Sequence, residues 1–383
     1  MAGIYIHIPF CKQACHYCNF HFSTSLAYKS DVIQAMLSEI RIRANAEEEE
    51  IAIISKEEHI ETIYFGGGTP SLLTESELHT LLAAIHANYT IDKNAEITLE
   101  ANPDDMEPVK LAQWKNAGIN RLSIGIQSFR EADLKWMNRA HNAAQARTAI
   151  EQARLAGFDN FSIDLIFGVP GLSLADWEEN VSIVTGMQIP HIACYALTVE
   201  NGTALKKMIA LKKKENVDSD EQAAHFTMLM QKMNEAGYEH YEISNFAKPG
   251  YRSRHNSSYW QGKKYIGIGP SAHSFNGKMR LWNRAHNIEY YRSLLQEVIP
   301  YEKEILSPVD QLNEYIMVSL RTAEGMDLAH IRNKFSLDEY ERINKLVINE
   351  LLPGQYVRKG EQIILTPQGK LLADAITVKL FSA

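Results

Sequence analysis

Short runs of apolar and β-branched residues recur along the first 210 residues, and most are followed by a stretch with helical periodicity. Six runs predict strands: Ile4–Ile8, Thr62–Phe65, Glu96–Leu99, Leu122–Ile126, Phe161–Phe167 and Ile192–Leu197. Helices are predicted between them at Leu26–Ala44, Glu75–Ala87, Glu107–Ala117, Ala143–Leu155 and Leu174–Gly186. Such alternation is typical of βαβ units and a parallel sheet. Six units are too few for a closed eight-unit barrel, so residues 1–237 are predicted to form a partial (β/α)6 TIM-like barrel of the α/β class.

The pattern changes after residue 210. A helix is predicted at Glu221–Glu235, and residues 238–304 are rich in glycine, aromatic residues and histidine, which indicates a loop-rich linking region. Residues 305–383 predict helices at Asp310–Thr322, Leu328–Phe335 and Leu337–Leu351, strands at Gln355–Lys359 and Gln362–Leu365, and a last helix from Pro367. Helices followed by a small hairpin indicate a C-terminal winged-helix-like α+β module.

Composition and charge narrow the class of protein. The net charge of −8 argues against a nucleic-acid partner, because nucleic-acid-binding proteins normally present a basic face. No apolar stretch reaches the roughly 18 residues of a membrane span, and the N-terminus lacks the pattern of a signal peptide. We therefore expect a cytoplasmic protein with no integral membrane segment. In that reducing compartment, clustered cysteines favour metal ligation over disulfides.

Three of the four cysteines, Cys11, Cys15 and Cys18, directly follow the first predicted strand. Thiolates are preferred ligands of iron–sulfur clusters, and three of them on a four-iron cubane leave one iron open to another ligand. The spacing C-x3-C-x2-C therefore favours a [4Fe–4S] cluster. A zinc site completed by His16 and chance clustering are the alternatives, although zinc ribbons use paired C-x2-C. The fourth cysteine, Cys194, is expected to be a buried, inert thiol.

Polar residues lie near the ends of successive predicted strands. Gly66-Gly67-Gly68-Thr69 follows the second strand, Glu100 ends the third, Gln127 ends the fourth, and Asp164 lies in the fifth. Arg139 follows the fourth strand in a segment predicted to be helical. Each residue alone could serve a turn, a cap or an ion pair. Together they indicate the mouth of an α/β barrel, where such residues build a ligand site.

These motifs resemble those of the radical S-adenosylmethionine (SAM) family. The shared elements are C-x3-C-x2-C with an early Tyr5, GGGTPS, LEANP, IGIQS and DLIFGVPG, and the resemblance extends over nearly the whole chain. It is strongest to the oxygen-independent coproporphyrinogen III oxidase group. The resemblance implies a reduced [4Fe–4S] cluster that passes an electron to the sulfonium of SAM and yields a 5′-deoxyadenosyl radical.

The resemblance also implies roles for individual residues. The cluster ligands would be Cys11, Cys15 and Cys18. The residues matching positions near SAM are Tyr5, Tyr17, Gly67, Gly68, Thr69, Glu100, Gln127, Arg139 and Asp164. Among these, the glycine loop would meet the amino-acid end of SAM, and Asp164 the ribose hydroxyls.

Two features depart from the oxidases of this group. Those enzymes carry a fourth cysteine at the position where this chain has Phe20. They also carry a long extension before the first barrel strand, whereas in this sequence the first strand is predicted to begin at residue 4. The motif C-x3-C-x2-C-x-F and the HNxxYW signature at 255–260 are instead similar to the haem chaperones of the group. This resemblance implies haem as cargo and acceptor haemoproteins such as respiratory cytochromes. A peripheral position at the inner membrane face is a further expectation.

The predicted haem site is in the segment 238–304. His255, Tyr259, Trp260 and His273 lie there, and imidazole can ligate haem iron while aromatic rings cover the macrocycle. His255 is the candidate ligand; alternatively, His255 and Asn256 form a structural corner by bonding to the backbone. Decarboxylation of coproporphyrinogen III, a radical reaction on another substrate, and nucleic-acid-binding regulation stay open as other functions. The sequence does not decide whether the protein is an enzyme, or its oligomeric state.

Overall fold

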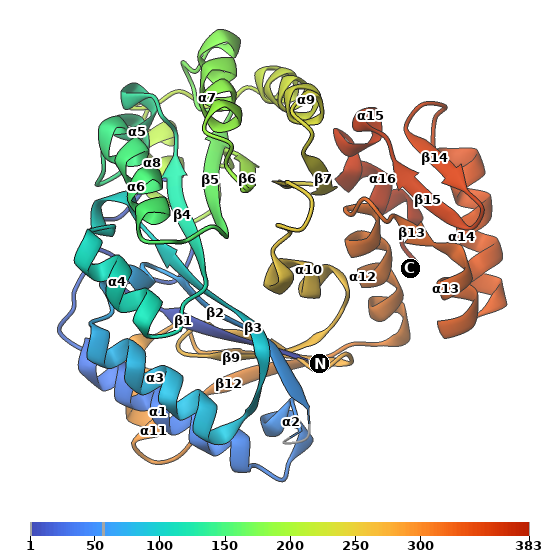
Figure 1. Cartoon of the computed structure of the whole chain (residues 1–383). Coiled ribbons are helices and arrows are strands. Elements are labelled where there is room, and N and C mark those ends of the chain that lie inside the picture. Colours follow the sequence, from blue (N-terminus) through green and yellow to red (C-terminus); the bar gives the residue numbers. More distant parts are fainter. Residues whose placement is uncertain (1, 56–57, 383) are drawn as a thin grey trace.

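A computed structural model describes residues 2–55 and 58–382. Its main sheet has twelve strands in the order β12-β11-β10-β9-β1-β2-β3-β4-β5-β6-β8-β7 (Figure 1). The central six strands are β1 (Ala2–Ile8), β2 (His59–Gly67), β3 (Thr90–Ala101), β4 (Arg121–Gln127), β5 (Phe161–Phe167) and β6 (His191–Ala196). They pair in parallel and in chain order. The α/β class and all six predicted barrel strands are confirmed.

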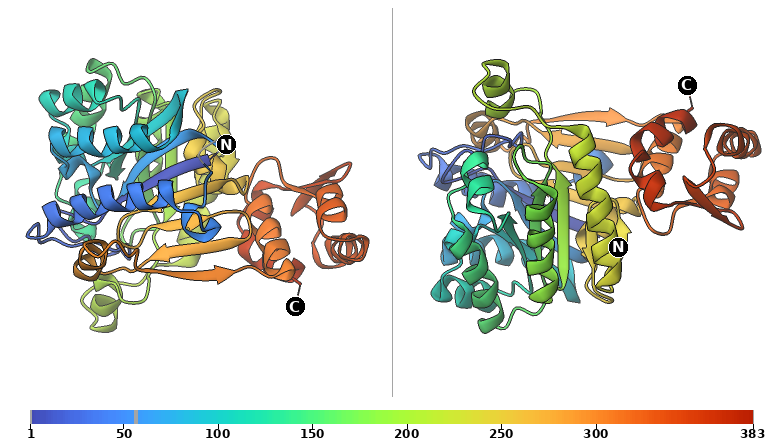
Figure 2. Two further views of the ribbon diagram at one scale, coloured as in Figure 1. Left: turned by 90° about the horizontal axis from the view of Figure 1, so that it is seen from below. Right: turned by 90° about the horizontal axis from the view of Figure 1, so that it is seen from above.

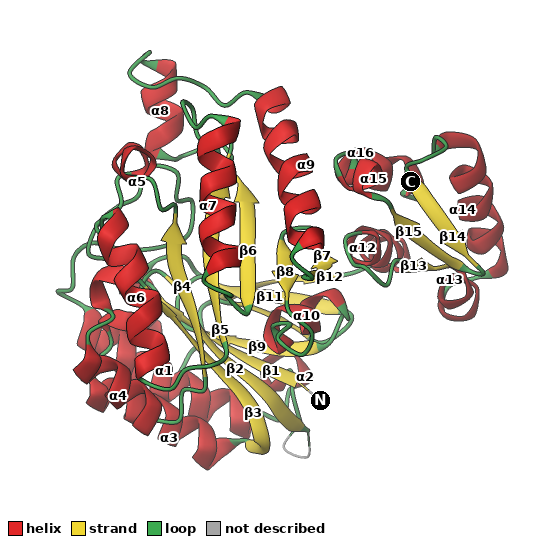
Figure 3. Ribbon diagram, turned by 45° about the horizontal axis from the view of Figure 1, so that its top comes forward, coloured by secondary structure: helices red, strands yellow, loops and turns green. Residues whose placement is uncertain are grey.

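Helices cover the outer face of these strands (Figure 3). The predicted ones are α1 (Lys29–Asn45), α3 (Glu75–Asn88), α4 (Pro108–Asn116), α6 (Ala143–Leu155), α7 (Leu174–Gly186) and α9 (Ser219–Glu235). Capping boxes at Thr74, Asn142 and Ser173 fix the starts of α3, α6 and α7. The sequence patterns missed short elements: α2 (Glu49–Ala52), η1 (Pro70–Leu72), η2 (Pro103–Asp105), α5 (Glu131–Met137) and α8 (Ala204–Ala210).

The segment 238–304 completes both edges of the main sheet and so differs from the loop-rich linker expected from its composition. It contains β7 (Glu239–Glu242), β8 (Asn245–Ala247), α10 (Arg254–Trp260), β9 (Lys264–Ile268), β10 (His273–Phe275), β11 (Met279–Asn283), α11 (Asn287–Leu294) and β12 (Tyr301–Ile305). The antiparallel pair β7–β8 extends the sheet beyond β6, and β9 pairs in parallel with β1. Strands of three to five residues are too short to show a clear alternation of apolar and polar positions.

Successive residues of β1 face the two sides of the sheet. Ile4, Ile6 and Ile8 are fully buried in the core beneath the helices. Tyr5 and His7 instead point to the concave side, where they line a cavity. The concave side therefore carries polar and aromatic groups that are available for function.

The C-terminal module lies beside the main sheet and has its own core (Figure 2). It consists of α12 (Pro308–Leu320), β13 (Met326–Asp327), α13 (Leu328–Lys334), α14 (Leu337–Glu350), β14 (Tyr356–Lys359), β15 (Gln362–Leu365), α15 (Pro367–Lys370) and α16 (Ala373–Leu380). The helices and the hairpin match the prediction; β13 adds a third strand to the hairpin. Glu242 of β7 forms a β-bridge with Thr322, and Arg280 of β11 forms an ion pair with Glu314 of α12. The module therefore contacts the main sheet at both ends: at the edge strand β7 and at β11, which is next to the other edge strand.

Within the described residues, we find no helix with the length and apolar character needed to cross a membrane.

Candidate cofactor site

The three clustered cysteines lie on the loop that leaves the carboxyl end of β1. Cys11, Cys15 and Cys18 are each partly exposed. The loop is folded back on itself, because the Cys11 N–H donates to the carbonyl oxygen of Ser23 (3.0 Å) and the Ser23 N–H donates to that of Pro9 (2.9 Å). The parallel strand β1 therefore delivers the cysteines to the barrel mouth, where ligand sites of this architecture form.

Two of the thiols accept hydrogen bonds from neighbouring strands and loops. Thr69 Oγ1 donates to Cys11 Sγ and Arg139 Nη1 donates to Cys15 Sγ, each at 3.3 Å. Burial raises the pKa of the Cys11 thiol to about 11, and the nearby Cys18 and Cys15 add to this effect. Positive charge beside the Cys11 thiol is therefore needed to stabilise its thiolate form. An iron–sulfur cluster supplies that charge, and hydrogen bonds to its sulfurs are a usual means of tuning it.

The arrangement does not suit a single zinc ion. Among residues 2–55 and 58–382, no three His, Cys, Asp or Glu side chains converge as ligands of one ion. The His16 ring, proposed above as a fourth zinc ligand, is directed at the carbonyl oxygen of Trp136 (3.3 Å). A four-iron cluster binds each thiolate on a separate iron, so its ligands need not converge on a point. The cysteine loop therefore fits the [4Fe–4S] assignment better than the zinc alternative.

Arg139 joins the cysteine loop to the barrel strands. It follows α5 in the link to α6, and so it lies outside the helical segment expected for it. Its Nη2 donates to Asn102 Oδ1 (2.8 Å) and to the carbonyl oxygen of Gly125 (2.9 Å), and its Nη1 lies 3.5 Å from the Tyr17 hydroxyl. Its Nε is buried and has no partner among the described residues. A buried donor without a partner is available to an acceptor on a bound ligand.

Gly67 and Gly68, at the end of β2, allow this strand to approach the end of β1 and the start of the cysteine loop closely. Gly67 has φ +104°, and a Cβ added there would lie 2.7 Å from the His7 ring. A Cβ on Gly68 would lie 2.7 Å from the carbonyl oxygens of Ile8 and Phe10, and the Gly68 N–H donates to Ile8 (2.8 Å). The glycines therefore let the end of β2 pack against the chain that leads to Cys11.

Two carboxyl groups, Glu100 on β3 and Asp164 on β5, face the barrel interior. Burial and the charge of Asp164 raise the pKa of Glu100 to about 8, although the Tyr64 hydroxyl donates to Glu100 Oε1 (2.8 Å). Burial also raises the pKa of Asp164 to about 6, against the opposing charges of Arg121 and Arg139. Two carboxyl groups with raised pKa values form a site where a cationic ligand would be stabilised.

The remaining residues of the predicted SAM set are spread along the same mouth. Gln127 ends β4 with φ +66°, an uncommon conformation for a residue other than glycine. Tyr5 stacks on Tyr64 with ring centroids 6.1 Å apart. The sequence interpretation missed Asn102, which accepts from Arg139 and donates to Thr69 Oγ1 (3.4 Å). Its position two residues after Glu100, in LEANP, is the signal that could have identified it.

His255 lies against β1 and β2, where its ring stacks on Tyr64 and Tyr5 with centroid distances of 5.0 and 6.4 Å. It is on α10, and both of its ring nitrogens have partners: Nδ1 lies 2.8 Å from Thr62 Oγ1, and Nε2 lies 2.8 Å from the Tyr259 hydroxyl. Burial lowers its pKa to about 3. Haem ligation by His255 would require one of these hydrogen bonds to break. The geometry favours the structural alternative, with side chains rather than the backbone as the partners of the ring.

Comparison with known proteins extends these observations to the whole chain. The model of the radical SAM superfamily matches residues 5–183, and that of the HemN C-terminal domain matches residues 306–372. The radical SAM family implies a [4Fe–4S] cluster and SAM.

Full-length relatives are named haem chaperone HemW. The protein from Mycobacterium tuberculosis is 33% identical over 98% of this chain and 93% of its own length. The protein from Bacillus subtilis is 33% identical over 98% of each chain. The structure of coproporphyrinogen III oxidase (HemN) from Escherichia coli matches with a TM-score of 0.84 at 21% identity, over 100% of this chain and 90% of that chain, which shows a common fold. The chain therefore belongs to the radical SAM superfamily and, within it, to the family of these HemW proteins.

Proposed function

We propose that this protein is a haem chaperone that binds a [4Fe–4S] cluster, SAM and haem, and delivers haem to haemoproteins such as respiratory cytochromes. The observation that carries the proposal is the likeness to HemW proteins over 98% of the chain. The replacement of the oxidase-type fourth cysteine by Phe20 agrees with it. The acceptors are membrane-associated in this proposal, and the protein meets them from the cytoplasm at the inner membrane face.

We assign the cofactor residues on the basis of the contacts described above. Cys11, Cys15 and Cys18 hold the cluster, and Thr69 and Arg139 donate hydrogen bonds to two of the thiolates. The backbone of Gly67 and Gly68 meets the amino-acid end of SAM. When bound and reduced, the cluster supplies the electron that can cleave SAM.

The other SAM contacts surround the acidic pair. Glu100 and Asp164 balance the positive charge of the ligand, and Asp164 also accepts from the ribose hydroxyls. Tyr5, Tyr17, Gln127 and Arg139 complete the wall of the site. In this arrangement the protein groups bind and orient SAM and keep water from the open iron.

A second candidate function is the oxygen-independent oxidation of coproporphyrinogen III. The likeness in fold to HemN favours it, with a TM-score of 0.84. An oxidase would convert coproporphyrinogen III to protoporphyrinogen IX, whereas a chaperone would bind haem without this conversion. Both can be assayed on one preparation of the protein.

We expect the anaerobically reconstituted protein to bind haem at about one per chain and not to decarboxylate coproporphyrinogen III. Absorption titration measures the haem, and chromatography of the porphyrins measures the product, with an authentic oxidase assayed in parallel as the positive control. Formation of protoporphyrinogen IX by the wild-type protein would overturn the chaperone proposal.

The raised pKa of Glu100 predicts that SAM binds more tightly as the pH rises. Below pH 8 the free protein holds Glu100 protonated, because its pKa is about 8. A cationic ligand favours the carboxylate, so binding releases a proton, and the affinity increases with pH until it levels off above the pKa. Glu100→Gln should remove this dependence and weaken binding by one to two decades, about 1.5–3 kcal/mol for a charged hydrogen bond.

Calorimetry of the cluster-loaded protein between pH 6.5 and 9 measures both effects. Glu151→Gln, on the exposed face of α6, is the matched control and should behave as wild type. A pH dependence that survives in Glu100→Gln would assign the proton to another group.

A further inference from the structure

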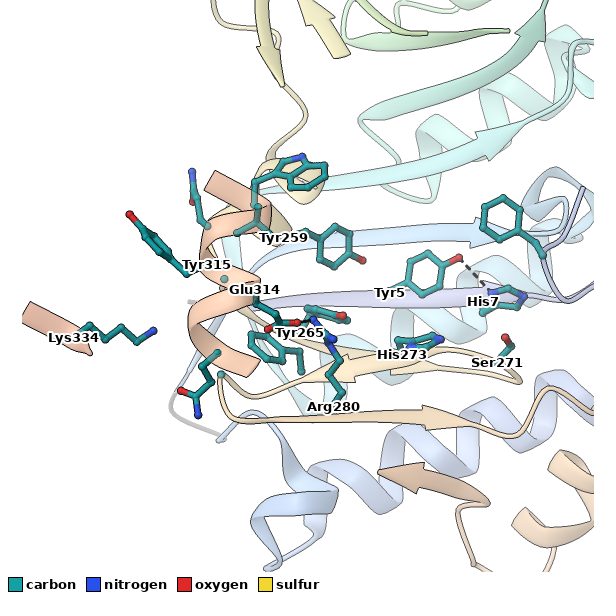
Figure 4. Close-up of a pocket in the computed structure, with 18 of the residues that line it drawn as sticks. Tyr5, His7, Tyr259, Tyr265, Ser271, His273, Arg280, Glu314, Tyr315 and Lys334 are labelled. Atoms are coloured by element: carbon teal, nitrogen blue, oxygen red, sulfur yellow. Dashed lines mark hydrogen bonds and ion pairs between the residues drawn. The ribbon is translucent and has the colours of Figure 1, made fainter. Parts of the chain in front are cut away.

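A large cavity lies on the concave side of the sheet, between the cysteine loop and the C-terminal module (Figure 4). Its volume is about 790 Å³, within the range of small-molecule and cofactor sites. Its walls come from β1, β9, β10 and β11, from α10, from the module helices α12 and α13, and from residues 19–21 directly after the last cluster cysteine. A ligand here would contact both the barrel and the module.

Four histidines line this cavity, and they differ in how their ring nitrogens are used. His7 has both nitrogens engaged, with the Tyr5 hydroxyl (3.3 Å) and the carbonyl oxygen of His21 (2.9 Å). His21 Nε2 is bound to Asn287 Oδ1 (2.8 Å). An axial ligand to haem iron needs a neutral imidazole with an accessible nitrogen. Neither His7 nor His21 is well placed to provide one.

His273 and His330 both meet this requirement among the described residues, and His273 is the more exposed of the two. It is exposed on β10, within the cavity, and among the described residues neither of its ring nitrogens forms a hydrogen bond. Its ring stacks on that of Trp282 of β11, with the ring centroids 6.1 Å apart. Partial burial and, after it, the charge of Arg280 lower its pKa, which favours the neutral imidazole that binds iron. His330, on α13, has its ring stacked closely on Tyr315 (4.4 Å).

The surroundings of His273 suit a flat, dianionic macrocycle. Tyr265 and Phe275 lie on adjacent strands with their rings 6.2 Å apart, and both line the cavity. Aromatic faces of this kind pack against a tetrapyrrole. Arg280 lies beside them in its ion pair with Glu314 of α12, and Lys334, which forms no ion pair among the described residues, lies at the module end of the cavity (Figure 4). Guanidinium and ammonium groups are the usual partners of carboxylates such as haem propionates.

We propose that haem binds in this cavity, with His273 as the protein ligand of its iron and the macrocycle on Tyr265 and Phe275. One propionate binds at Lys334, and the other replaces Glu314 at Arg280. This inference rests on the proposed haem-chaperone function and gives its cargo a location. It also gives the HNxxYW motif a role: Tyr259 and Trp260 line the cavity, and a hydrogen bond with His255 Nε2 (2.8 Å) positions the Tyr259 hydroxyl.

The test is an anaerobic haem titration of the wild-type protein and the variants His273→Ala, His330→Ala and His79→Ala. We expect His273→Ala to lose the spectroscopic signature of an imidazole ligand and to bind haem at least about tenfold more weakly, equivalent to about 1.4 kcal/mol. Added imidazole should restore the signature, because it can occupy the space left by the side chain. His79, exposed on α3 and outside the cavity, is the matched control and should bind haem as wild type does.

The possible outcomes separate this inference from the proposed function. If the wild-type protein binds haem and His273→Ala keeps both its affinity and its spectrum, haem is bound elsewhere and the inference is wrong. Loss of the signature in His330→Ala but not in His273→Ala overturns it as well. If the wild-type protein binds no haem, the chaperone proposal itself fails. Since His273 is exposed, a folding defect in the variant is not expected, and its circular dichroism spectrum checks this.

Discussion

Replacing Cys11, Cys15 or Cys18 individually with alanine is expected to abolish cluster binding. In the proposed site each thiolate would hold a different iron of the cubane, and the closest imidazole in sequence, His16, is directed at the carbonyl oxygen of Trp136. Analysis of iron and sulfide after anaerobic reconstitution, together with the visible absorption of the cluster, measures the effect. We expect essentially complete loss in each variant.

Cys194→Ala is the matched control for these variants and should keep a full cluster. Cys194 is 2% exposed on β6, and burial raises the pKa of its thiol. A buried thiol of this kind is inert toward iron. A full cluster in any one of the three loop variants would contradict the assignment of the ligands.

Replacing Glu39 with alanine should destabilise the folded protein by about 3–5 kcal/mol, the cost of leaving a buried charge without its partner. Glu39 is fully buried on α1 beside Arg43, whose Nε donates to Glu39 Oε1 (2.8 Å). The same carboxylate accepts from Asn283, from the N–H of Gly269 and from the Tyr290 hydroxyl, at 2.6 to 2.9 Å. It therefore fastens α1 to β11, α11 and the turn after β9.

The midpoint of urea denaturation measures this effect, and two further variants isolate its cause. Arg41 is on the same helix as Glu39 and forms an ion pair with Glu297; the two side chains are 55% and 68% exposed. Arg41→Ala breaks this pair and should lower the free energy of unfolding by less than about 1 kcal/mol. The double variant Glu39→Leu, Arg43→Met removes both charges and should be more stable than Glu39→Ala. Equal destabilisation by Arg41→Ala and Glu39→Ala would show that burial of the pair does not matter.

The bounds of a barrel strand were predicted well from the sequence where the strand is buried along its whole length. They were predicted poorly where part of the strand is exposed. β5 was predicted over its full length, because every residue from Phe161 to Phe167 except Asp164 is buried. β3 begins at Thr90, six residues before the predicted start, since its first half is exposed and carries Asp92, Lys93 and Asn94. The strand is specified there by pairing with β2, which a local pattern does not reveal.

The candidate site shows a similar division. The three cysteines, Thr69, Tyr17 and Arg139 were predicted from motifs. The structure links Thr69 to Cys11, and Arg139 to Cys15 and to the Tyr17 hydroxyl, by hydrogen bonds. The partners of His255 were not predictable, because Thr62 is 193 residues away in sequence. A histidine in a motif has the same appearance whether its ring is free or saturated with hydrogen bonds, and only the folded chain distinguishes the two.

The pairing of β1 with β9 has a consequence for synthesis of the protein on the ribosome. Ala2 pairs with Lys264, so the first strand waits for one of its two neighbours until most of the chain has been translated. At about 5–20 residues per second, this delay is roughly 10–50 seconds. During that interval β1 is an edge strand that pairs only with β2, and the cysteine loop follows directly after it. Residues 264–283, which include His273, have not yet been synthesised. In the proposed haem site, loading of haem must therefore wait until the segment that pairs with β1 and carries His273 has been made.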